Sequence, residues 1–238
     1  MKKKLLFIGN SHIGSIRAGF EIVNKNVLTN YQFSFCAASR NNFYKHRLVG
    51  DRFEFDKSVI NFNYNLESHI DLHQYDYCIC VFNVSPLARL KHKDYSFYSK
   101  ALLKNYIEKL YWLKTQEQDC CDLVLSIYKL INQKFIFVGA PLTSQFNHEL
   151  WHDNSYYTDQ ITNIREICDS YFDAPDKPKI LLPPEYLLNN SGFYTIEKYL
   201  KGALNADGQM NMNPKNKNHM NAEYGKIIIL ELLRKLQQ

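Results

Sequence analysis

The fold is decided by residues 4–12, which read Lys-Leu-Leu-Phe-Ile-Gly-Asn-Ser-His. Four apolar residues in a row end at a glycine, and this pattern is typical of a short buried strand. Apolar residues then recur at helical spacing over 13–23. We therefore expect a strand, a tight turn and a helix, with the hydroxyl of Ser11 at the start of the helix.

Four further apolar runs predict strands, and helical periodicity fills most of the intervals between them. This alternation favours an α/β fold of three layers, α/β/α, around a parallel five-stranded sheet. We expect the flavodoxin-like strand order 2-1-3-4-5 and a single domain over 1–238. The expected strands are 4–8, 31–38, 77–84, 134–139 and 179–182, and the expected helices are 13–23, 95–113, 122–131, 159–172 and 222–236, with a loop holding short elements over 40–74.

The composition is that of a globular protein. The net charge of +5 comes from 29 basic and 24 acidic residues, and part of the excess lies in Lys2–Lys4 and in Lys215 and Lys217. No basic stripe with interleaved aromatic residues is present, so we expect no nucleic-acid partner. The apolar run after Lys4 is too short for a secretion signal, and no run approaches the ~20 residues of a membrane span. We expect a cytoplasmic protein, and its oligomeric state stays open.

The cysteines favour a reducing compartment. None of the six forms a Cys-x-x-Cys pair, so we expect buried free thiols and no disulfide framework. They are Cys36, Cys78, Cys80, Cys120, Cys121 and Cys168.

Two polar motifs lie at opposite ends of the chain. A hydroxyl at a helix N-terminus, such as that of Ser11, is close to unpaired N–H groups and to the positive end of the helix dipole, which favour a developing oxyanion. The alternative is that Ser11 only caps the helix, as serines commonly do. The second motif is His-Met-Asn-Ala-Glu-Tyr-Gly over 219–225, which opens the last expected helix.

Together these motifs resemble the GDSL/SGNH hydrolases. Gly9-Asn10-Ser11-His12 resembles the first block of that family, and the run from His219 is similar to its last block. A serine near the amino end and a histidine near the carboxyl end also follow the order of the family. The resemblance implies a serine hydrolase with Ser11 as nucleophile and His219 as general base. We expect no metal and no cofactor.

The resemblance also implies an oxyanion hole. Its donors would be the N–H of Ser11, the side-chain amide of Asn83 and a second backbone N–H from Ala38 or Ser39. This chain departs from the family in two places. Val81 stands where the family has the glycine of Gly-x-Asn, and no glycine follows the second expected strand.

The acid of the triad is not marked by its usual position. The family places an aspartate three residues before the histidine, where this chain has Asn216. Asp207 lies further upstream, and the glycine that follows it permits a tight turn. We assign Asp207 as the acid, while an orienting Asn216 and a dyad without an acid stay open.

Two other pairs of histidines have spacings that occur among metal ligands. The run from His148 to His152 matches His-Glu-x-x-His, but its polar, turn-rich flanks predict no zinc-binding helix. His69 and His73 have i, i+4 spacing and are expected to be solvated.

No phosphate-binding glycine motif is present, so no nucleotide cofactor is expected. His12 is interpreted as a pocket neighbour that points away from Ser11, and not as the base.

The expected partner is a small-molecule or carbohydrate ester. The predicted function is an esterase that acts through an acyl-enzyme on small acyl esters, with O-acetyl groups of carbohydrates as the preferred class. Two alternatives stay open: an O-acyltransferase of surface-polysaccharide biosynthesis, and a catalytically silent carbohydrate-binding relative.

Overall fold

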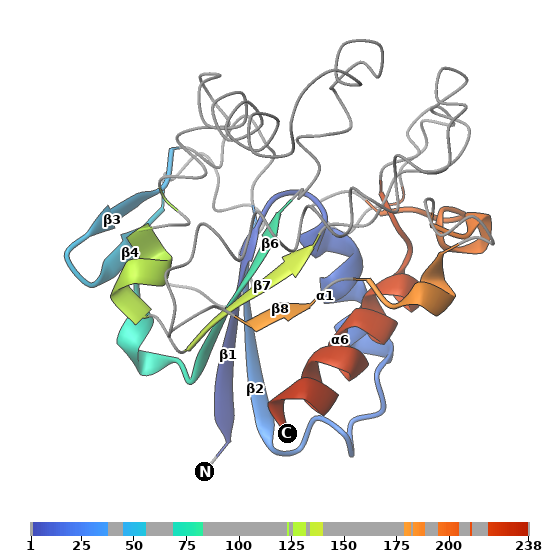
Figure 1. Cartoon of the computed structure of the whole chain (residues 1–238), viewed down its shortest axis with the longest axis horizontal. Helices are drawn as coiled ribbons and strands as arrows, with labels where there is room; N and C mark the ends of the chain where they lie inside the picture. The colour runs from blue at the N-terminus through green and yellow to red at the C-terminus, as the bar shows by residue number, and fades with distance from the viewer. Residues whose placement is uncertain are drawn as a thin grey trace, which may run out of the picture.

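The computed structural model of the protein describes a central sheet, the helices packed on it and a second, smaller sheet (Figure 1). It includes the segments on which Ser11 and His219 lie. The residues that it describes are 2–37, 45–55, 69–82, 123, 126–131, 134–139, 179–181, 183–188, 195–204, 210 and 219–237. The predicted helices at 95–113 and 159–172 lie outside these residues.

The central sheet is parallel throughout. Its strand β1 (Lys3–Gly9) pairs with β2 (Tyr31–Ala37) on one side and with β6 (Tyr77–Phe82) on the other. Beyond β6 follow β7 (Phe135–Gly139) and β8 (Lys179–Leu181), which gives the order β2-β1-β6-β7-β8. The predicted α/β class with a parallel sheet is confirmed. The direction of strand succession reverses at β1, and in such sheets ligands bind beyond the carboxyl ends of the strands near this point.

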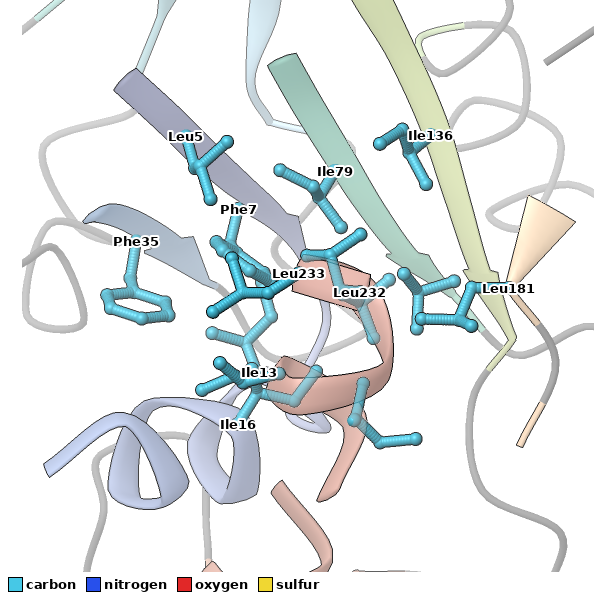
Figure 2. Packing of buried hydrophobic residues seen from close by; sticks show 14 of the residues in the cluster. Leu5, Phe7, Ile13, Ile16, Phe35, Ile79, Ile136, Leu181, Leu232 and Leu233 are labelled. Carbon is cyan, nitrogen blue, oxygen red and sulfur yellow. The ribbon is translucent and has the colours of Figure 1, made fainter. Parts of the chain in front are cut away.

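One face of the sheet packs against helices α1 (Ile13–Ile22) and α6 (Ala222–Leu236). Leu5 and Phe7 of β1 point into this layer and are fully buried. Figure 2 shows them with side chains of both helices around them. Burying each such side chain contributes roughly 1.5–3 kcal/mol, so this layer holds the two helices against β1. The helix residues labelled there are Ile13, Ile16, Leu232 and Leu233.

The opposite face is also covered. Leu6 and Ile8 alternate with the residues above and are equally buried, because successive strand side chains point to opposite faces. Residues 126–131 are helical, and the ring of Tyr128 meets that of Phe135 edge-on at 5.6 Å. Helices therefore lie on both faces of the sheet. The predicted free thiols that the structure describes, Cys36, Cys78 and Cys80, are buried and unpaired in disulfides.

Helices α1 and α6 approach each other backbone to backbone. A Cβ atom added to Gly225 would overlap the carbonyl oxygen of Ser15, and one added to Gly19 would overlap the backbone at Gly225 and Lys226. Only glycine permits so short a distance, since any larger residue would push the helices apart. Ser15 lies in the first turn of α1 and Gly225 in the first turn of α6, so the two helix N-termini are held together.

The interval 40–74, predicted as a loop with short elements, contains a second sheet. Strands β3 (Arg47–Val49), β4 (Arg52–Glu54) and β5 (His69–Asp71) pair antiparallel in the order β3-β4-β5. Each strand has only three residues, which is too short for a period-two pattern to stand out. The buried ring of Phe53 anchors this sheet.

The C-terminal helix begins and ends where the sequence predicted, at 222 and 236, and α1 ends one residue early. Among the described residues, no helix has the length and apolar character that crossing a bilayer requires.

The α1–α6 contact predicts the effect of Gly225→Ala. Helix propensity alone would make this change stabilising by about 1 kcal/mol. The overlap with Ser15 opposes it, and overpacking of this kind typically costs roughly 1–3 kcal/mol. We expect net destabilisation, measured as a lower urea midpoint. Leu230→Ala, at an exposed position of the same helix, is the control with little effect. A Gly225→Ala protein more stable than wild type would contradict the close approach.

Candidate active site

Ser11 lies in the turn between the carboxyl end of β1 and the start of α1 (Figure 1). The turn is tight. The Ile13 N–H donates to the carbonyl of Asn10 at 3.1 Å, and the Gly14 N–H donates to that of Ser11 at 3.1 Å. Gly9 is required just before it, because a Cβ there would overlap the backbone of β6. The backbone around Ser11 is therefore fixed from both sides.

The side chains of Ser11 and His219 form a hydrogen bond. Nε2 of His219 lies 2.8 Å from Oγ of Ser11, although 208 positions separate the two residues. The contact predicted from the sequence is thus confirmed. The alternative, that Ser11 caps α1, is wrong, since the N-cap position belongs to His12 and has no side-chain capping hydrogen bond.

Burial keeps His219 neutral. It lowers the pKa of this imidazole below its usual value, because a low-dielectric environment disfavours the charged form. At neutral pH the ring therefore carries one proton, and Nε2 accepts the Ser11 hydroxyl proton when that proton is on Nδ1. This is the state in which a histidine serves as a general base.

His12 lies closer to His219 than the sequence suggested. Their ring centroids are 5.4 Å apart, and His12 is almost completely buried. Burial lowers the pKa of His12 to about 3, with the nearby His219 as the smaller cause. Nδ1 of His12 is buried and has no hydrogen-bond partner among the residues that the structure describes. His12 is thus a neutral, buried side chain next to the ring of His219.

The backbone N–H of Ser11 has no acceptor among the residues that the structure describes. It lies at the N-terminal end of α1, where the helix dipole places partial positive charge. A neighbouring side chain completes the turn, since Oδ1 of Asn10 accepts a hydrogen bond from the N–H of His12 at 3.1 Å. A free N–H beside the serine hydroxyl is the arrangement that an oxyanion hole needs.

One residue near the site received no role in the sequence analysis. Asn221 follows His219 by two positions and caps α6, with Oδ1 accepting from the N–H of Tyr224 at 3.1 Å. An asparagine directly before an apolar-periodic run is an ordinary helix-start signal, so the cap itself could have been predicted.

Several predicted residues lie outside the described part of the chain. For the oxyanion hole these are Asn83, Ala38 and Ser39, and for the acid Asp207 and Asn216. The zinc-type pair His148 and His152 lies outside it too. Their assignments stay predictions.

The other histidine pair lies on the surface. His69 and His73 are exposed, and Nε2 of His73 is 3.7 Å from a carboxylate oxygen of Asp51. Within the described ranges, no three His, Cys, Asp or Glu residues are grouped as metal ligands.

Comparison with known proteins gives only distant similarities. No protein-family model matches the sequence, and no curated protein matches it. A solved structure provisionally described as a platelet activating factor from Streptococcus pneumonia aligns over 98% of this chain and 85% of its own, at 10% identity and a TM-score of 0.46. A lipase/acylhydrolase from Enterococcus faecalis aligns over 99% of this chain and 95% of its own, at 9% identity and a TM-score of 0.45.

The burial of His12 predicts a pH-dependent stability. In the unfolded chain this histidine protonates near pH 6.5, whereas in the folded protein it stays neutral down to about pH 3. The unfolded state binds more protons in this interval, so the free energy of unfolding falls as the pH is lowered. His12→Gln removes this contribution. From about pH 7.5 to about pH 5, wild type should lose about 2 kcal/mol more than the variant.

Urea denaturation of both proteins at the two pH values measures this difference. A stability difference that does not change with pH would mean that His12 protonates as easily in the folded protein as in the unfolded chain.

Proposed function

We propose that this protein is a serine esterase in which Ser11 is the nucleophile and His219 the general base. The observation that carries the proposal is the 2.8 Å contact between Oγ of Ser11 and Nε2 of His219 at the carboxyl end of β1. A serine hydroxyl is a weak nucleophile until a base within hydrogen-bond reach takes its proton. The lowered pKa of His219 supports this role, because it keeps the base unprotonated at neutral pH.

The reaction would proceed in two halves. Nε2 of His219 takes the hydroxyl proton while Oγ bonds to the acyl carbonyl carbon, and the carbonyl oxygen becomes an oxyanion. Collapse of this intermediate breaks the ester bond, and the imidazolium gives its proton to the leaving alkoxide. A water molecule then attacks the acyl-enzyme with His219 again as base, which releases the acid and restores Ser11.

The oxyanion would be held by fixed donors. Among the described residues the N–H of Ser11, at the start of α1, has no acceptor, and this supports this part of the proposal. Following the resemblance to the GDSL/SGNH hydrolases, we assign the side-chain amide of Asn83 as a second donor and a backbone N–H from Ala38 or Ser39 as a third. Asp207 is the proposed acid.

We propose small acyl esters as substrates, with O-acetyl groups of carbohydrates as the preferred class. The same acyl-enzyme would also serve an O-acyltransferase if an acceptor hydroxyl replaced water. Turnover of an acetyl donor with and without a sugar acceptor separates the two.

Variants of the two central residues test the proposal. Ser11→Ala and His219→Gln should each lower kcat for p-nitrophenyl acetate by ~10³-fold or more. Each variant removes one of the two partners in the proton transfer from the Ser11 hydroxyl to His219. The double variant should be no worse than either single one, since the residues act together. Ser126→Ala, at an exposed serine, is the matched control. Full turnover by folded Ser11→Ala protein would refute the proposal.

The same kinetic series identifies the acid. If Asp207 orients His219 and stabilises its cation, Asp207→Asn should lower kcat severely and Asn216→Ala should do much less. The reverse ranking would make Asn216 the orienting group. Two nearly unaffected variants would leave a dyad of Ser11 and His219.

A further inference from the structure

The segment that carries His219 is tied to a distant turn of the chain. The Leu204 N–H donates to the carbonyl of Met220 at 3.0 Å, and the Asn221 N–H donates to that of Tyr199 at 2.8 Å. The two bonds use the carbonyl and the N–H of the same peptide group, the one that joins Met220 to Asn221. The backbone between His219 and α6 is therefore paired with residues 199–204.

The side chain of Asn221 joins the same two segments. Its Nδ2 donates to the carbonyls of Lys198 and Lys201, at 3.0 Å each, while its Oδ1 caps α6 through the N–H of Tyr224. Both amide protons and the amide oxygen are thus used. One side chain caps a helix and clamps a turn at the same time.

The turn that Asn221 clamps is itself anchored in the core. Tyr199 and Ala203 are buried, and the ring of Tyr199 meets that of Tyr224 edge-on at 6.1 Å. Gly202 has a φ of +73°, a backbone conformation that glycine adopts without strain. The turn is therefore a firm support for the residues that precede α6.

We infer that Asn221 is a positioning residue for the base: its two Nδ2 hydrogen bonds fix the segment that holds His219 at hydrogen-bond distance from Ser11. The inference rests on the proposed function and adds to it a residue that touches neither substrate nor the reacting atoms. Met220 is the one residue between Asn221 and His219, and its side chain is buried. A shift of the clamp therefore passes directly to the imidazole.

The capping role and the clamping role can be separated by substitution. Serine caps a helix about as well as asparagine, but its short hydroxyl cannot reach two carbonyls. Asn221→Ser therefore keeps the start of α6 and loses the clamp without adding charge. Asn221→Ala loses both. Ile229→Val, more than two helical turns further along α6 at a buried position, is the control for a comparable loss of stability.

We expect Asn221→Ser to lower kcat for p-nitrophenyl acetate by ~10- to 100-fold with KM nearly unchanged, because a displacement of about 1 Å at a reacting group costs up to ~100-fold. Ile229→Val should keep kcat within ~2-fold, a change typical of a side chain that does not position the base. NMR titration gives a readout independent of activity. The pKa of His219 should rise toward its usual value in Asn221→Ser as the ring gains solvent, while His12, the titratable group that the described residues place against this ring, stays neutral.

An Asn221→Ser protein with wild-type kcat and an unchanged His219 titration would overturn the inference. Equal losses of kcat in Asn221→Ser and Ile229→Val would also overturn it, because stability alone would then explain the effect. The proposed function fails by a different result, namely turnover by Ser11→Ala. In that case the titration of His219 in Asn221→Ser still decides whether Asn221 positions this ring.

Discussion

The close contact between α1 and α6 is the constraint on which the site depends. Gly225 meets Ser15 where both helices are in their first turn, so the two helix N-termini are held side by side. Ser11 lies two residues before the start of α1, and His219 lies three residues before the start of α6. A contact between two backbones thus brings together side chains that are 208 positions apart. The β1 strand adds the second support, because Leu5 and Phe7 hold both helices on one face of the sheet.

Burial determines the charge state of the two histidines beside Ser11. His219 and His12 lie ring to ring, and burial lowers the pKa of both. Two neutral imidazoles can share such a site, whereas two cations could not. The N-terminal end of α1 supplies positive potential instead, since the N–H of Ser11 there has no acceptor in the described part of the chain. A negative charge next to Ser11 would therefore be stabilised, and the neutral ring of His219 can accept a proton.

The sequence predicted those parts that depend on local pattern. The apolar run before Ser11 indicated β1, and the periodic run after Asn221 indicated α6 with its correct bounds. The contact of Ser11 with His219 was predicted from the resemblance of two motifs on that framework to those of the GDSL/SGNH hydrolases. The strands of 47–71 were missed because three residues are too few for a periodic signal. The burial of His12 was missed because it depends on the long-range placement of His219. The position of His12 on the helix after Ser11 does not predict that His219 packs next to it.

The most direct test of the central claim is the site at which a fluorophosphonate probe reacts. Such a probe forms a covalent bond with a serine whose hydroxyl is activated by a base. Mass spectrometry of peptides from the labelled protein should find one adduct, on Ser11, and the labelling rate should fall sharply in folded His219→Gln protein. Labelling of another serine, or equal rates for wild type and His219→Gln, would contradict an activated nucleophile at the carboxyl end of β1.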